Sequence, residues 1–143
     1  MREILFRGKK VHSDKWLYGV PVKGTEKDVN EMIMIANVFD QEGYCCRGCN
    51  LDPVIPETIG QYTGLTDKNG KKIFEGDRVK CNGDFGLGTI VYNSGSFAVE
   101  YDKPIKEEWR GTLLFCLINE NGILECEVIG NIHDNPELLE DKT

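Results

Sequence analysis

Residues 54–77 read VIPETIGQYTGLTDKNGKKIFEGD, and this stretch decides which fold the chain can take. Pro56 fixes its own backbone angle and disfavours a helical conformation at the residue before it, which predicts a short extended segment followed by a turn. Ile59, Tyr62 and Leu65 then recur at three-residue intervals. That spacing predicts one helical or 3₁₀ turn that places three apolar side chains on a core.

The rest of the stretch contains two turn sequences. Residues 66–71 include Asn69-Gly70, a pair that can take the positive φ values of a hairpin turn. The same fragment is faintly similar to a calcium-binding loop, but it lacks the remaining acidic ligands and the distal glutamate, so the turn interpretation is favoured. Glu75-Gly76-Asp77 predicts a second turn that leads into a strand.

On both sides of this stretch the chain alternates apolar and polar residues in short runs. Residues 3–7 and 15–22 predict a β-hairpin near the start of the chain. Residues 86–92 and 97–101, joined across 93–96, predict the clearest hairpin of the sequence. Short strands that recur about every ten residues, with glycine turns between them, indicate a small barrel or sandwich.

Two apolar segments allow more than one interpretation. Residues 32–39, MIMIANVF, predict a strand, with a short helix as the alternative, and residues 113–118 are compatible with either. Residues 127–132 are expected to pair back onto an early strand and close the barrel. Pro136 suits the first position of a terminal helical turn, and residues 140–143 are expected to fray.

Three stretches taken together resemble the YopX family of phage and prophage proteins: MREILFRGKK at residues 1–10, residues 54–77, and EVIGNIHDNPELL at residues 127–139. The resemblance implies a C-terminal barrel similar to SH3 domains and supplies no established biochemical activity. We therefore expect a mainly β chain with minor helix. Its expected parts are an N-terminal β-rich subdomain with a leading hairpin (1–52), an SH3-like barrel (53–139) and a frayed tail (140–143).

Composition restricts the possible partners and the location. The 143 residues carry a formal net charge of −7, which opposes binding to a phosphate backbone and suits a basic protein surface better. Residues 1–20 resemble neither a signal peptide nor a membrane span. We expect a cytoplasmic protein without membrane attachment, and the family resemblance implies a bacterial host cell.

The six cysteines are expected to be thiols, because the cytosol keeps ordinary disulfides reduced. Cys45, Cys46 and Cys49 include a two-residue spacing that can aim two thiolates at one zinc ion, but the usual second pair of ligands is absent. The sequence favours loop thiols over a zinc site or a redox motif there. We expect folding to need neither metal nor cofactor. The remaining cysteines lie in or beside apolar runs and should behave as small hydrophobic residues: Cys81, Cys116 and Cys126.

No catalytic constellation is visible in the sequence. His12 and His133 are the only histidines, and no serine or cysteine nucleophile has a context that places one of them beside it. Acidic pairs are usually solvated in a chain with 24 acidic residues. Residues 83–88 lack the Lys-Ser/Thr ending of a phosphate-binding loop. We therefore expect a protein that is not an enzyme.

Two binding functions remain. The first is a protein-interaction module that binds a host factor or another copy of itself, as a homo-oligomer, through the aromatic residues Tyr62, Phe74 and Tyr92 or an exposed strand edge. The second is a nucleic-acid-binding module that uses a cluster of basic residues, which would have to share one face: Lys68, Lys71, Lys72, Arg78 and Lys80. The simpler alternative for each residue is that the aromatics form the core and the lysines solubilise turns. The acidic charge favours the protein partner.

Overall fold

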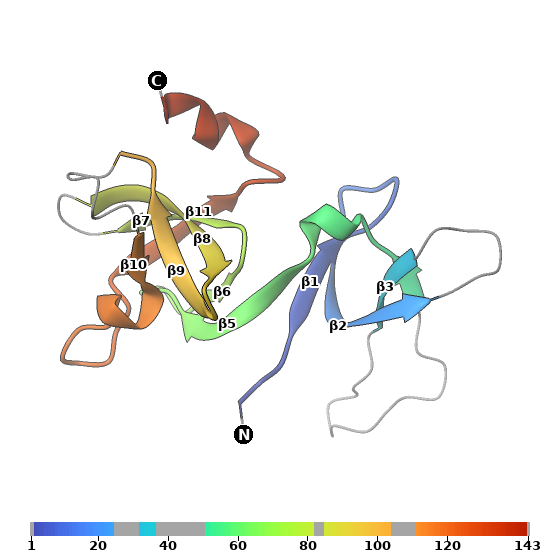
Figure 1. Ribbon diagram of the computed structural model, residues 1–143, viewed down its shortest axis with the longest axis horizontal. Helices are drawn as coiled ribbons and strands as arrows, with labels where there is room; N and C mark the ends of the chain where they lie inside the picture. Colours follow the sequence, from blue (N-terminus) through green and yellow to red (C-terminus); the bar gives the residue numbers. More distant parts are fainter. Residues whose placement is uncertain (1, 25–31, 37–50, 82–84, 104–110, 143) are drawn as a thin grey trace. The chain divides into compact units, whose positions relative to one another are not determined.

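The computed structural model describes residues 2–24, 32–36, 51–81, 85–103 and 111–142 (Figure 1). The backbone divides into two compact units, Met1–Tyr62 and Thr63–Thr143. The described strands pair in antiparallel fashion, so the prediction of a mainly β chain is confirmed. Among the described residues, no helix is long and apolar enough to cross a membrane.

In the first unit the predicted hairpin is present. Its strands pair with Phe6 opposite Gly19 and Lys9 opposite Trp16. Residues 32–36 form a strand rather than a helix and pair with the second strand of the hairpin. The hydrogen-bonded order is β4-β3-β2-β1, and the strands are β1 (Phe6–Lys9), β2 (Trp16–Gly24), β3 (Met32–Ala36) and β4 (Leu51–Pro53).

The start of the stretch 54–77 differs from the prediction. A 3₁₀ helix, η1, spans only Pro56–Thr58, and residues 60–66 form a strand, β5 (Gly60–Thr66), so the helical turn predicted through Tyr62 and Leu65 is wrong. Burial alternates along the first residues of β5, as a strand requires, and β5 pairs with β1. The boundary predicted at residues 52 and 53 falls within β4. The two units divide later, between Tyr62 and Thr63 inside β5. The first residues of β5 belong to the first unit because Gly60 and Gln61 pair with β1.

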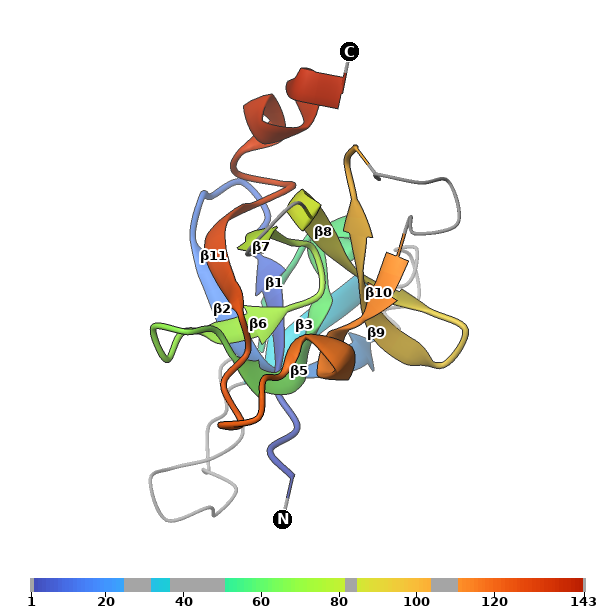
Figure 2. The same cartoon turned by 90° about the vertical axis from the view of Figure 1, so that its left-hand side faces the viewer.

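The second unit contains a five-stranded sheet in the order β10-β9-β8-β7-β11. The strand β6 (Lys72–Phe74) belongs instead to the other sheet, whose full order is β4-β3-β2-β1-β5-β6. Figure 2 shows β11 on the left of β7 and β8, with β9 and β10 on the right. The strands of this sheet are β7 (Asp77–Cys81), β8 (Gly86–Asn93), β9 (Ser96–Tyr101), β10 (Gly111–Leu113) and β11 (Cys126–Asn131).

Two predictions for this sheet can be compared with the pairing. The β8–β9 hairpin is present and turns at Ser94 and Gly95, whose φ angles are 51° and 81°. The last strand also pairs with an early strand, since β11 lies beside β7. The described strands nevertheless form two antiparallel sheets rather than a closed barrel, because the second sheet ends at the edges β10 and β11.

The core of the second unit lies on one face of this sheet. Val79, Gly88 and Tyr101 occupy one row across β7, β8 and β9. Gly88 has to be small, because an ideal Cβ there would lie 2.5 Å from Cγ1 of Val99. The buried cluster comprises Ile73, Val79, Cys81, Ile90, Val99, Tyr101, Leu114, Leu124 and Cys126.

Two short 3₁₀ helices, η4 and η5, lie among the described residues after β10. The first, η4 (Leu114–Leu117), follows β10 directly, so the alternatives left open for residues 113–118 resolve into a strand end and a helical turn. The second, η5 (Pro136–Lys142), begins at the predicted proline and continues through residues that were expected to fray.

Candidate functional site

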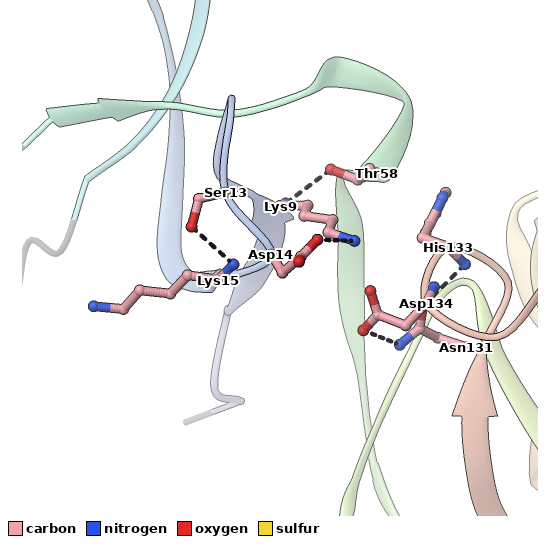
Figure 3. A network of polar contacts seen from close by, with 8 residues as sticks. All are labelled: Lys9, Ser13, Asp14, Lys15, Thr58, Asn131, His133 and Asp134. Carbon is pink, nitrogen blue, oxygen red and sulfur yellow. Dashed lines mark hydrogen bonds and ion pairs between the residues drawn. The ribbon is translucent and has the colours of Figure 1, made fainter.

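Thr58, near the start of the stretch 54–77, is a structural link within the first unit. The Thr58 hydroxyl donates a 2.6 Å hydrogen bond to the Ile55 carbonyl and accepts one of 2.8 Å from the backbone N–H of Lys9. Figure 3 shows Thr58 facing this amide, with the Lys9 side chain 3.4 Å from the Asp14 carboxylate. Thr58 thus holds η1 to β1.

Asp67 organises the turn that was compared with a calcium loop. Its Oδ1 accepts hydrogen bonds of 2.8 Å from the Asn69 amide and 2.9 Å from the Lys71 amide, and its Oδ2 accepts one of 3.0 Å from the Val128 amide. Burial alone raises the pKa of this carboxyl, but the three N–H donors and the Lys71 charge outweigh it and hold the pKa below its ordinary value. Gly70 has the expected positive φ, 82°. The carboxylate therefore joins the turn to β11.

A second aspartate fixes the next turn. Asp77 is buried, and its Oδ2 accepts a 2.8 Å hydrogen bond from the Phe74 amide across Glu75-Gly76. Gly76 has φ 88°, and its amide donates to the Ile90 carbonyl at 2.8 Å. The Glu-Gly-Asp sequence is therefore a turn motif that joins β6 to β7, as predicted.

Arg78 differs most from its predicted role. It was assigned to a basic cluster for nucleic acid, yet it is 0% exposed. Its guanidinium forms a two-pronged pair with the Asp102 carboxylate and donates 2.8 Å hydrogen bonds to Thr89 Oγ1 and to the Leu138 carbonyl. Because Arg78 alternates with the core residue Val79, its side chain leaves β7 on the face opposite the core. There it holds β8, the end of β9 and η5 together.

The C-terminal motif is also structural. Asn131 Oδ1 accepts hydrogen bonds of 2.9 Å from the amides of both His133 and Asp134, and its Nδ2 donates to the Asp134 carboxylate at 3.1 Å (Figure 3). A Cβ on Gly130 would lie 2.5 Å from Oδ1 of Asn135, so the glycine lets the turn pack against β11. The Gly-Asn-Ile-His-Asp-Asn sequence thus ends the sheet with a side-chain-capped turn.

The aromatic residues proposed for binding occupy two kinds of environment. Tyr62 and Phe74 are buried, each in its own unit, so neither offers an exposed ring to a partner. Tyr92 is 54% exposed at the end of β8 and packs edge to face against Phe97, with ring centroids 5.1 Å apart. Of the three, Tyr92 alone presents a large exposed surface.

The lysines of the predicted cluster are exposed but do not form an uncompensated basic surface. Lys68 lies 3.3 Å from the Glu127 carboxylate, and Lys80 is the cross-strand neighbour of Glu127. Lys71 and Lys72 are exposed beside the Asp67 turn. With Arg78 buried, the five basic residues do not share one exposed face.

The described cysteines differ in burial. Cys81 and Cys126 lie opposite one another across β7 and β11 and are buried, whereas Cys116 is exposed. The hydrogen bond with Cys81 and burial both raise the pKa of the Cys126 thiol. The zinc alternative at Cys45, Cys46 and Cys49 falls outside the described residues. Within the described part of the chain, no group of three His, Cys, Asp or Glu residues could hold a metal ion.

One exposed surface was not singled out from the sequence. Residues 111–125, which we call the acidic apolar segment, expose the large side chains of Leu113, Phe115 and Ile123. A sequence signal existed, because residues 111–141 contain no Lys or Arg. Periodicity alone could not separate these exposed apolar residues from the core residues between them.

Comparison with known proteins identifies the fold but no activity. A family model described as YopX protein matches residues 5–140. The crystal structure of protein EF1440 from Enterococcus faecalis is similar, with 22% sequence identity over 97% of this chain and 99% of that chain and a TM-score of 0.52. No curated protein matches.

Proposed function

Because the chain belongs to the YopX protein family, we propose that it is a non-catalytic protein-interaction module that binds a host protein or a second copy of itself. We propose that the protein is a phage or prophage gene product that acts in the bacterial cytoplasm. In this proposal the second unit binds its protein partner, as SH3-like modules do.

The observation that carries the proposal is the contrast between buried polar and exposed apolar groups. Asp67, Asp77 and Arg78 make structural hydrogen bonds inside the second unit. Several large apolar side chains are exposed instead, and Phe115 is the most exposed among the described large hydrophobic residues. Apolar groups held at the surface of a folded unit favour a protein partner over a polar substrate.

Nucleic acid is the second candidate, since Lys71 and Lys72 are exposed. Two observations count against it. First, the Arg78 guanidinium is buried and paired with the Asp102 carboxylate. Second, Glu127 lies beside both Lys68 and Lys80. Nonspecific binding to a phosphate backbone depends on uncompensated Lys and Arg, and the net charge of −7 opposes it further.

The test uses the full chain as bait for bacterial cytoplasmic proteins. Each captured protein is purified and its dissociation constant measured by calorimetry, because capture alone does not establish direct binding. In parallel, fluorescence anisotropy with labelled DNA and RNA is recorded between about 50 and 200 mM salt. We expect a direct protein complex and no tight nucleic-acid binding. Micromolar nucleic-acid binding that weakens steeply with salt and is lost when Lys71 and Lys72 are replaced by glutamine would reverse the assignment.

A further inference from the structure

The acidic apolar segment is an ordered excursion from the edge of the second sheet. It starts in β10, whose residues pair only with β9 among the described strands, and continues without a break into η4. The chain then turns back at Asn119, whose Oδ1 accepts 3.0 Å hydrogen bonds from the amides of Asn121 and Ile123. A bridge between Ile118 and Leu124 closes this turn.

Buried leucines anchor the segment to the core of the second unit, which keeps its exposed side chains from turning inward. Leu114 and Leu124 are buried in the core of the second unit, and Leu117 and Ile118 pack against that core. The residues next to these anchors therefore project outward. Phe115 is 61% exposed, Ile123 50% and Leu113 42%.

The charged side chains within the segment itself are all acidic. Glu120 and Glu125 are exposed within the segment, and Asn119 Nδ2 donates to Glu125 Oε1 at 3.4 Å. No Lys or Arg occurs between residues 111 and 141, whereas that range contains seven acidic residues. The negative charge of the chain is thus concentrated in the part that also exposes Phe115.

We propose that the acidic apolar segment is a docking surface for a basic amphipathic segment of a protein partner, in which aromatic or aliphatic side chains alternate with Lys or Arg. This inference rests on the proposed protein-binding function and assigns its site and the chemistry of its partner. The apolar side chains of the partner would cover Phe115 and Ile123 and remove them from water. Its basic side chains would meet Glu120 and Glu125, which steers the encounter and excludes acidic competitors.

The test is selection of a random peptide library displayed on phage against the immobilised full chain. Enriched peptides are synthesised and their affinities measured by anisotropy for the wild type and for Phe115→Ser, Ile123→Ser and Ile129→Ser. Ile129 is the matched control, because it is an exposed isoleucine of the same unit outside the segment. The fold of each variant is checked by urea unfolding.

We expect enriched peptides to combine aromatic or aliphatic residues with Lys or Arg. Phe115→Ser should weaken their binding about tenfold or more, Ile123→Ser should also weaken it, and Ile129→Ser should leave it unchanged. Binding should weaken with salt.

Three outcomes would overturn the inference: no enrichment, enrichment of acidic peptides, or equal affinity for the wild type and Phe115→Ser. The last outcome would preserve protein binding and move its site elsewhere, which separates failure of this inference from failure of the proposed function. The other partner that could cover the acidic apolar segment is a second copy of the chain. Sedimentation that shows a dimer dispersed by Phe115→Ser would replace the basic partner with self-association.

Discussion

Replacing Asp67 by alanine removes a buried carboxylate that accepts three backbone hydrogen bonds in the second unit. A hydrogen bond to a charged group contributes about 1.5–3 kcal/mol. We apply this value in full to the half-buried amide of Val128, and about 0.5 kcal/mol each to the amides of Asn69 and Lys71, because these exposed residues can bind water instead. The expected loss of unfolding free energy is about 3 kcal/mol.

Urea unfolding at neutral pH, followed by circular dichroism, measures this loss. With an m-value of about 2 kcal/mol/M, the midpoint should fall by about 1.5 M. Glu120→Ala, which removes an exposed carboxylate from the same unit, is the control and should change stability by less than about 0.5 kcal/mol. A loss for Asp67→Ala no larger than that of the control would refute the structural role of the carboxylate.

The sign of the pH dependence follows from the same site. The folded-state pKa of Asp67 lies below its ordinary value of 3.8, so the ionised carboxylate stabilises the folded state. This contribution is present in full above about pH 3.8 and is lost as the pH falls through the lower, folded-state pKa. The stability difference between the wild type and Asp67→Asn should therefore stay constant near neutral pH and shrink below pH 3.8. A difference that grows on acidification would contradict the assignment.

Three further predictions concern the second unit. Gly88→Ala should destabilise it by about 1–3 kcal/mol, because the new Cβ would lie 2.5 Å from a valine methyl group, whereas Gly111→Ala meets only a carbonyl at 3.5 Å and should be nearly neutral in urea unfolding. Among the described cysteines, iodoacetamide should modify the exposed Cys116 long before the buried Cys126, as mapped by mass spectrometry; equal rates would contradict the burial. Truncation before Glu127 removes almost all of β11 and should abolish cooperative unfolding in calorimetry, whereas a sharp transition would show that β11 is dispensable.

The hairpins could be predicted because their information is local. In the β8–β9 hairpin, Ser94-Gly95 supplies the two positive φ angles of a tight turn, and the two flanking apolar runs pair directly across it. The strand β5 could not be recognised in the same way. Gly64 has φ 86° in the middle of this strand, which interrupts the alternation of side chains and leaves a three-residue spacing that imitates a helical turn.

The candidate site was harder to predict than the fold, because its decisive contacts join distant residues. Arg78 and Asp102 are 24 positions apart in the sequence, and Lys68, near the start of the second unit, pairs with Glu127, near its end. Nothing in the local sequence separates a buried arginine from a basic surface residue. The exposure of Phe115 depends in the same way on its neighbour Leu114 filling the core. The absence of Lys and Arg between residues 111 and 141 is visible in the sequence, but its meaning depends on which apolar residues face outward.

Site-specific photocrosslinking in bacterial cells that produce the full chain tests the central claim most directly. Phe115 or, as the control, Ile129 is replaced by the photoreactive analogue p-benzoylphenylalanine, and the crosslinked species are identified by mass spectrometry. The account predicts crosslinks from position 115 to a basic segment of one protein, absent from position 129. Crosslinks to nucleic acid, or the same products from both positions, would contradict a protein-docking surface at the acidic apolar segment.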